Sequence, residues 1–104
     1  MPFSEFSLLK TDHYLVIKIA SDRQSNTVNG LKNCTEYILQ MDDVHRAEIN
    51  LELVNYLGSA DLGDLLILRN VVYKKFGVIP KVTGMSDGVR KSFEISNFHK
   101  LFGV

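Results

Sequence analysis

The sequence predicts an α/β fold in which a small mixed β-sheet carries its helices mainly on one face. Short apolar segments typical of strands alternate with longer segments that repeat apolar residues at helical spacing. The segment 46–53 alternates polar and apolar residues without a break, as a strand does when one face is covered and the other is wet. A chain of 104 residues has room for one hydrophobic core, so we expect a single domain over residues 1–104.

Two strands open the expected order of elements. Phe3–Leu9 predicts a short edge strand, and a polar turn at residues 10–13 leads into a second strand over Tyr14–Ala20. The second strand is rich in β-branched residues, so we expect it to be buried. The polar segment 21–26 then separates these strands from the first helix.

The first helix should begin near Thr27, with Asn26 or Thr27 as the N-cap that accepts a hydrogen bond from a free backbone N–H group. Its buried stripe is predicted from residues at helical spacing, namely Val28, Leu31, Cys34 or Thr35, and Ile38. Because Cys34 falls on this stripe, we expect it to be a small core residue and not a nucleophile.

The second half alternates strands and helices. The strand of residues 46–53 is followed by a helix over Leu62–Phe76, which Gly77 should end. Gly63 would then lie in the first turn of this helix. The residues expected to face the core are Ala47, Ile49, Leu51 and Leu53 in the strand and Leu62, Leu65, Leu66, Val72 and Phe76 in the helix.

Val78–Thr83 predicts the last strand, which Pro80 places at an edge of the sheet because proline has no N–H group to donate. Ser86 should cap a third helix that runs to about Ser96 with Val89 and Phe93 facing inward, and the tail Leu101–Phe102 should dock onto the body. The order is β-β-α-β-α-β-α. Its two crossovers are too long for hairpins, so the strands that they join should be parallel.

Composition and charge restrict the class of protein. The net charge is zero, so we expect no nucleic-acid partner, and the longest apolar run has four residues, too short for membrane insertion. The single cysteine and the lack of a signal-peptide pattern favour the cytoplasm. Residues 1–64 hold 5 basic and 10 acidic side chains, and residues 65–104 hold 7 basic and 2 acidic side chains. The acidic first part and the basic second part either form solvated faces or help to orient a charged partner.

Four segments match a known family in order and spacing: Ile49–Leu51, Val54–Gly63, Lys81–Phe93 and Phe98–Phe102. Over this second half the chain resembles the STAS family, which includes bacterial anti-sigma factor antagonists. The resemblance implies a STAS-like fold. In the first half, Ala20-Ser21-Asp22-Arg23 stands where the family usually has Gly-x-Leu-Asp after the second strand.

Ser59 stands at the position of the serine that, in the family, is phosphorylated by a partner kinase that is also an anti-sigma factor. The family loop usually reads Asp-Ser-x-Gly ahead of Leu-Gly. Here it reads Gly58-Ser59-Ala60-Asp61-Leu62-Gly63, so the serine is kept and both flanking markers are replaced. Three interpretations of Ser59 stay open: a working phosphorylation site, a contact surface that has lost its switch, and a helix cap.

Asp61 supports a separate hypothesis. A carboxylate in the first helical turn stabilises the helix by about 0.3–1 kcal/mol and would repel a nearby phosphate. We therefore hypothesise that Asp61 partly imitates a permanently phosphorylated loop and biases the protein toward one binding state.

The resemblance implies a non-enzymatic, protein-binding regulatory module that acts by partner switching with a kinase-type anti-sigma factor. The expected contact residues are Asp22, Gly58, Ser59, Ala60, Asp61 and Asp64. The alternative within the family is a cytoplasmic accessory subunit that docks on the ATPase of a lipid or solute ABC transporter. The edge strand and the wet sheet face permit a monomer or a weak homodimer.

No catalytic centre, metal site or cofactor is expected from the sequence. His13, His45 and His99 are far apart along the chain and form no His-x-x-x-His pair. The glycines at 84 and 88 lie in a turn that lacks the lysine of a phosphate-binding loop, and no convergent set of titratable groups is visible.

Overall fold

The computed structural model describes residues 5–20 and 27–102 of the chain. Within these ranges five strands form one sheet in the order β3-β1-β2-β4-β5. The strands are β1 (Glu5–Thr11), β2 (Tyr14–Ala20), β3 (Thr27–Asn29), β4 (Arg46–Asn50) and β5 (Lys81–Thr83). The helices are α1 (Leu31–Leu39), α2 (Ser59–Phe76), α3 (Asp87–Ile95) and α4 (His99–Phe102).

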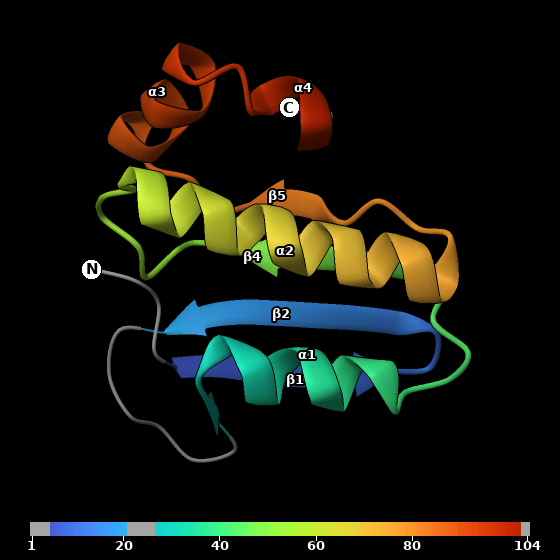
Figure 1. Cartoon of the computed structure of the whole chain (residues 1–104). Coiled ribbons are helices and arrows are strands. Elements are labelled where there is room, and N and C mark those ends of the chain that lie inside the picture. The colour runs from blue at the N-terminus through green and yellow to red at the C-terminus, as the bar shows by residue number, and fades with distance from the viewer. Residues whose placement is uncertain (1–4, 21–26, 103–104) are drawn as a thin grey trace.

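The sheet is mixed, which confirms the predicted α/β fold class. β1 and β2 form an antiparallel hairpin in which Thr11 lies opposite Tyr14, whereas β2 and β4, and then β4 and β5, pair in parallel. α1 and α2 lie in the two crossovers between parallel strands, as right-handed βαβ connections require. Both helices lie over the same face of the sheet, and α3 and α4 lie beyond them on the side of β5 (Figure 1). The arrangement is consistent with a STAS-like fold.

The prediction that the first strand lies at an edge is wrong, because β3 pairs with β1 on the side away from β2. Thr27 and Val28, which the helical spacing had placed in the first helix, belong to this added strand, in line with the strand preference of β-branched residues. α1 therefore begins at Leu31, after Gly30 with its positive φ of 88°. Gly30 holds the N-cap position without a side-chain hydrogen bond, and Asn26 lies outside the described residues.

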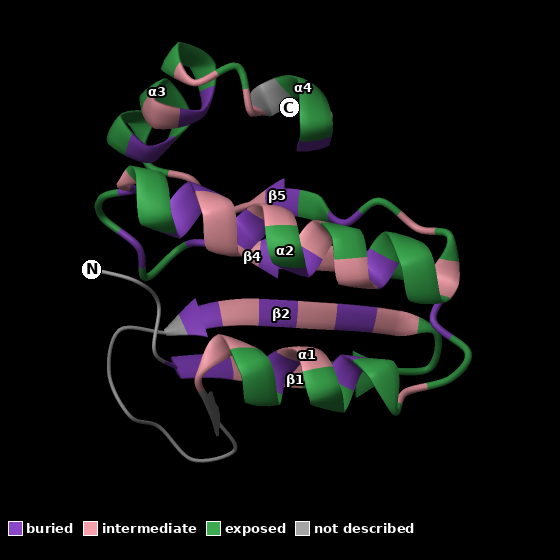
Figure 2. Cartoon of the chain, in the orientation of Figure 1, coloured by how far each residue is buried: buried purple, intermediate pink, exposed green. Residues whose placement is uncertain are grey.

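The core lies between the sheet and its helices as one hydrophobic cluster. Buried and half-buried residues alternate along β2, which shows that one face of the sheet is covered and the other is not (Figure 2). Cys34 and Ile38 of α1 are buried, as predicted. The strand residues in the cluster include Phe6, Leu15, Ile17, Ile19, Ala47, Ile49 and Val82.

β4 is shorter than the alternation predicts. Leu51 is buried, but Leu53 is 37% exposed, so the prediction that Leu53 faces the core is wrong. The side chain of Asn50 causes the change, because its Oδ1 accepts a hydrogen bond from the Glu52 N–H at 2.9 Å, and the Val54 N–H donates to the Leu51 carbonyl. These bonds turn the chain where two-residue alternation would have continued the strand.

α2 begins at Ser59, three residues earlier than expected, and ends at Gly77, whose φ of 71° fits the predicted role of this glycine. Gly63 consequently lies in the second turn and not in the first. Of the expected stripe, Leu62, Leu65 and Val72 are buried and Leu66 and Phe76 are half-buried, while the buried Leu68 was not predicted.

The last strand is short and lies at an edge of the sheet, as Pro80 predicted. Ser86 caps α3, since its Oγ accepts a hydrogen bond from the Val89 N–H at 3.3 Å. Val89 and Phe93 are fully buried, and Phe102 of α4 packs edge-on against the Phe93 ring. Leu101 is exposed, so only Phe102 docks as expected. No helix in the described part of the chain is long and apolar enough to cross a membrane.

Candidate functional site

The loop of residues 51–58 leaves the carboxyl end of β4 and leads into α2. Its start is tied to β5 by a hydrogen bond from the Leu51 N–H to the Thr83 carbonyl at 2.8 Å. Loops at the carboxyl ends of parallel strands are the usual place for binding sites in α/β sheets. Ser59 and Ala60 are exposed at this end as the first two residues of α2. Ser59 is therefore a helical residue and not the N-cap, so the cap interpretation of this serine is wrong.

Gly58 occupies the N-cap position of α2. Its φ of −90° and ψ of 177° describe an extended backbone that any residue can adopt. A Cβ at this position would lie 3.6 Å from atoms of Asp61 and Tyr56, which is ordinary van der Waals contact. The position therefore has room for a Cβ, and a longer acidic side chain would lie close to the Asp61 carboxylate.

Asp61 is 2% exposed, and its Oδ2 accepts a hydrogen bond from the Gly58 N–H at 2.8 Å. This bond satisfies one of the N–H groups left free at the start of a helix. The second carboxylate oxygen, Oδ1, is buried and finds no hydrogen-bond partner among the described residues. The carboxylate is thus turned into the cap and away from the surface, which favours a capping role over the presentation of charge to a partner.

The other contact residues predicted from the sequence lie in different settings. Asp64 is half-buried one turn into α2, and Asp22 lies outside the described residues. The sequence analysis did not single out two exposed apolar side chains, Tyr56 at 72% exposure in the loop and Ile67 at 46% exposure in the middle of α2. Exposed apolar side chains are common in protein contact surfaces, and their exposure could only be found from the fold.

The uncovered face of the sheet carries a hydrogen-bond network centred on Glu48. Its Oε1 accepts from the Tyr14 hydroxyl and its Oε2 accepts from the Thr83 hydroxyl, both at 2.6 Å. These bonds lower the pKa of Glu48 below its ordinary value, and the bond from Thr83 has the larger effect. The bond to Glu48 raises the pKa of Tyr14. Glu48 therefore stays ionised and links three neighbouring strands on the open face.

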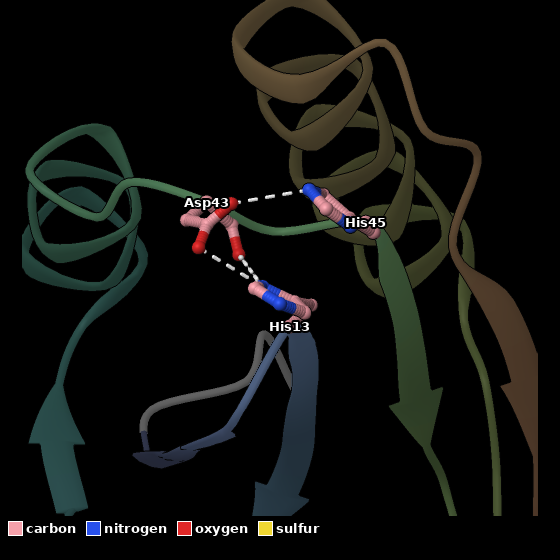
Figure 3. Close-up of side chains that lie close together, drawn as sticks. All are labelled: His13, Asp43 and His45. Carbon is pink, nitrogen blue, oxygen red and sulfur yellow. Dashed lines mark hydrogen bonds and ion pairs between the residues drawn. The ribbon is translucent and has the colours of Figure 1, made fainter.

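A second cluster, which the sequence analysis missed, lies at the opposite end of the parallel strands. It consists of His13 in the β1–β2 turn, Asp43 in the α1–β4 loop and His45 just before β4 (Figure 3). Asp43 Oδ2 lies 3.0 Å from His13 Nδ1, and Asp43 Oδ1 lies 3.1 Å from His45 Nε2. The two imidazole rings stack with their centroids 4.3 Å apart. The separation of these two histidines along the chain therefore did not exclude a grouping of possible metal ligands, although the sequence analysis had expected it to.

The register of the sheet explains this cluster. Tyr14 of β2 pairs with Arg46 of β4, so His13 and His45, which precede them, meet at the amino ends of these strands. The His13 carbonyl accepts hydrogen bonds from the N–H groups of His45 at 2.8 Å and of Arg46 at 3.1 Å. Among the described residues, His13, Asp43 and His45 form a group whose ligand atoms all lie within 4.8 Å of one another, so they could hold a metal ion.

Cys34 is fully buried, and this burial raises the pKa of its thiol to about 12. A thiol with this pKa stays protonated at neutral pH and is a poor nucleophile. Its position on α1 agrees with the predicted core role.

No protein-family model matches the chain, and no curated protein matches it significantly. The resemblance to STAS domains consequently rests on the residues of the second half and on the α/β architecture.

Proposed function

We propose that the protein is a non-enzymatic regulatory module of the anti-sigma factor antagonist kind, which works in the cytoplasm by partner switching. In this proposal it docks onto a kinase-type anti-sigma factor through the loop of residues 51–58, Ser59 and the exposed side of α2. The observation that carries the proposal is the exposure of Ser59 as the first residue of an 18-residue helix, at the carboxyl end of β4.

The surface around Ser59 has the character that such a contact needs. Ala60 is exposed and Gly63 is half-buried near the start of α2, and Ile67 is exposed on the same side in the middle of the helix, so this side carries small and apolar residues. Tyr56 adds an exposed aromatic ring from the loop. A phosphate on Ser59 would place close to two negative charges beside this apolar surface, and desolvation of that charge would oppose docking.

The two departures from the family loop are compatible with this mechanism. Gly58 has an extended backbone that does not depend on glycine, so an aspartate could adopt the same backbone conformation. Asp61 directs its carboxylate to the Gly58 N–H, where it caps the helix. Ser59 thus keeps its position and exposure, and what the loop has lost is a carboxylate at position 58 that a kinase could recognise.

The test begins with the partner, captured from native lysate with the whole chain as bait and identified by mass spectrometry. We expect an anti-sigma factor with a kinase domain; capture of a transporter ATPase would favour the accessory-subunit alternative instead. The purified partner is then incubated with ATP and the chain, and the intact mass is measured. We expect a gain of one phosphate in the wild type and in Ser86→Ala, which removes the other exposed serine at a helix start, and none in Ser59→Ala.

Gly58→Asp gives a second measurement, because it introduces the aspartate that STAS domains usually have, at a position where a Cβ fits. We expect faster phosphate transfer and a small loss of stability, because the new carboxylate lies close to the buried Asp61 carboxylate. An unshifted mass in both the wild type and Gly58→Asp, with a kinase that is active on another substrate, would contradict phosphorylation of Ser59. A phosphate that persists in Ser59→Ala would do the same.

A further inference from the structure

The histidine end of the sheet carries a donor set that the proposed function does not use. It combines two imidazole nitrogens with one carboxylate, and its side chains are 52% (His13), 59% (Asp43) and 64% (His45) exposed. We propose that His13, Asp43 and His45 bind one divalent transition-metal ion of the Zn²⁺ type.

The three ligand atoms lie within 4.8 Å of one another, close enough for one ion to gather them. Zinc takes imidazole nitrogen and carboxylate oxygen at about 2.0–2.2 Å, and tetrahedral geometry then places neighbouring ligand atoms about 3.3 Å apart. Asp43 contacts the two rings through different oxygens, Oδ2 at 3.0 Å from His13 Nδ1 and Oδ1 at 3.1 Å from His45 Nε2 (Figure 3). An ion would draw one of these oxygens and the two nitrogens together, and the stacked rings, with centroids 4.3 Å apart, would turn so that both nitrogens face it.

The backbone holds these donors in place before any ion arrives. The parallel register of β2 and β4 fixes His13 beside His45, and both His45 and Arg46 donate backbone hydrogen bonds to the His13 carbonyl. Asp43 adopts a positive φ of 63°, a conformation that aspartate tolerates better than most residues. Because the backbone positions are set by the sheet, the ion does not have to order a loose loop, and more of the binding free energy is retained.

The chemistry of the donors selects the kind of ion. Imidazole suits Zn²⁺, Co²⁺, Ni²⁺ and Cu²⁺, whereas Mg²⁺ and Ca²⁺ prefer sets made of oxygen alone. Three protein donors leave at least one position open, which water or a ligand from another molecule can fill. The nearby charges are mixed: the Asp42 carboxylate is next in sequence but lies 4.0 Å from the Lys75 ammonium, and the Arg46 guanidinium lies over the Tyr14 ring, 5.4 Å from its centroid.

Isothermal titration calorimetry of the untagged chain with Zn²⁺ tests the proposal. We expect saturable binding of one ion per chain, and at least about tenfold weaker binding in each of His13→Ala, His45→Ala and Asp43→Asn. The matched control is Asp42→Asn, which removes the adjacent exposed carboxylate and should change the affinity less than about twofold. All four changes lie on the surface, and circular dichroism checks that each variant is folded.

Two further readouts separate a site from loose surface binding. Co²⁺ should give the visible absorption of a nitrogen- and oxygen-ligated ion in the wild type and in Asp42→Asn, and lose it in His13→Ala. Mg²⁺ should produce no saturable heat. The proposal is overturned if Zn²⁺ produces no saturable heat, if His13→Ala and His45→Ala bind as tightly as the wild type, or if Asp42→Asn weakens binding as much as Asp43→Asn does.

Discussion

The two ends of the parallel strands carry their candidate sites in different ways. At the carboxyl end, residues 58–61 form one continuous stretch of sequence that starts a helix. At the amino end, His13, Asp43 and His45 come from a hairpin turn and a crossover loop, and only the pairing of β2 with β4 brings them together. The first site is a local feature of the chain, whereas the second exists only once the sheet has formed.

Because of this difference, substitutions in the core and in the helix cap should affect the two ends differently. A substitution in the core weakens the sheet and should therefore disturb both ends. A substitution in the α2 cap should disturb the carboxyl end alone, because the histidine end depends on hydrogen bonds between β2 and β4. The following variants test that separation, in order of decreasing effect.

Ile49→Ala should have the largest effect. Ile49 is fully buried and pairs with the equally buried Ile17 in the centre of the sheet. Deleting its side chain leaves a cavity, and the expected loss is about 2–5 kcal/mol in the free energy of unfolding, measured by urea denaturation. Amide exchange should speed up at both ends. Leu9→Ala, at 60% exposure on β1, is the control and should cost less than about 1 kcal/mol; equal losses would contradict the assigned core.

Asp61→Ala should destabilise the protein by about 1 kcal/mol, because it removes the acceptor of the Gly58 N–H at the start of α2. The burial of the unpartnered Oδ1 offsets part of this loss. Urea denaturation measures the stability, and Zn²⁺ titration should show an unchanged histidine end. Asp87→Ala removes an exposed acid from the first turn of α3 and should cost about 0.5 kcal/mol. An Asp61→Ala variant as stable as the wild type would contradict the capping role.

Gly63→Ala should stabilise the protein by about 0.5–1 kcal/mol. Gly63 lies in the second turn of α2, and an added Cβ would meet no atom within 4 Å. Thermal denaturation measures the change. Gly84→Ala is the matched control with the opposite sign, because Gly84 has a φ of 71° and its Cβ would lie 3.0 Å from the Glu52 backbone nitrogen. A destabilising Gly63→Ala would show that α2 does not continue through this turn.

The smallest effect concerns acid stability. The pKa of Glu48 is lowered in the folded state, chiefly by the Thr83 hydroxyl and then by the Tyr14 hydroxyl. A lowered carboxyl pKa contributes stability above the pKa of the unfolded chain, and this contribution is lost as the pH falls through the folded pKa. Thr83→Val should therefore raise the Glu48 pKa and reduce stability at neutral pH, with the difference from the wild type shrinking in acid.

Carboxyl-carbon NMR titration measures the Glu48 pKa directly, and urea denaturation over a pH series measures the stability. Thr35→Val is the control, because the Thr35 hydroxyl bonds to the Lys32 carbonyl and lies away from the network. An unchanged Glu48 pKa in Thr83→Val would show that the Thr83 hydroxyl does not hold the carboxylate.

The same contrast explains which features could be predicted from the sequence: local features could, and features that depend on tertiary contacts could not. Local patterns gave the fold class, the cap by Ser86 and the end of α2 at Gly77, because each depends on neighbouring residues. β3 was missed because Thr27 and Val28 fit helical spacing as well as a strand, and only pairing with β1 decides between them. The burial of Asp61 and the meeting of His13 with His45 depend on tertiary packing and register, which residue spacing does not encode.

We propose that the carboxyl end, with the loop of residues 51–58 and the start of α2, is the surface that docks on a protein partner. Hydrogen–deuterium exchange of the chain alone and in complex with its captured partner tests this claim most directly. We expect added protection over residues 56–67 and unchanged exchange in the β1–β2 turn that carries His13. Protection confined to the open face of the sheet, or to α3 and α4, with none over residues 56–67, would contradict the claim.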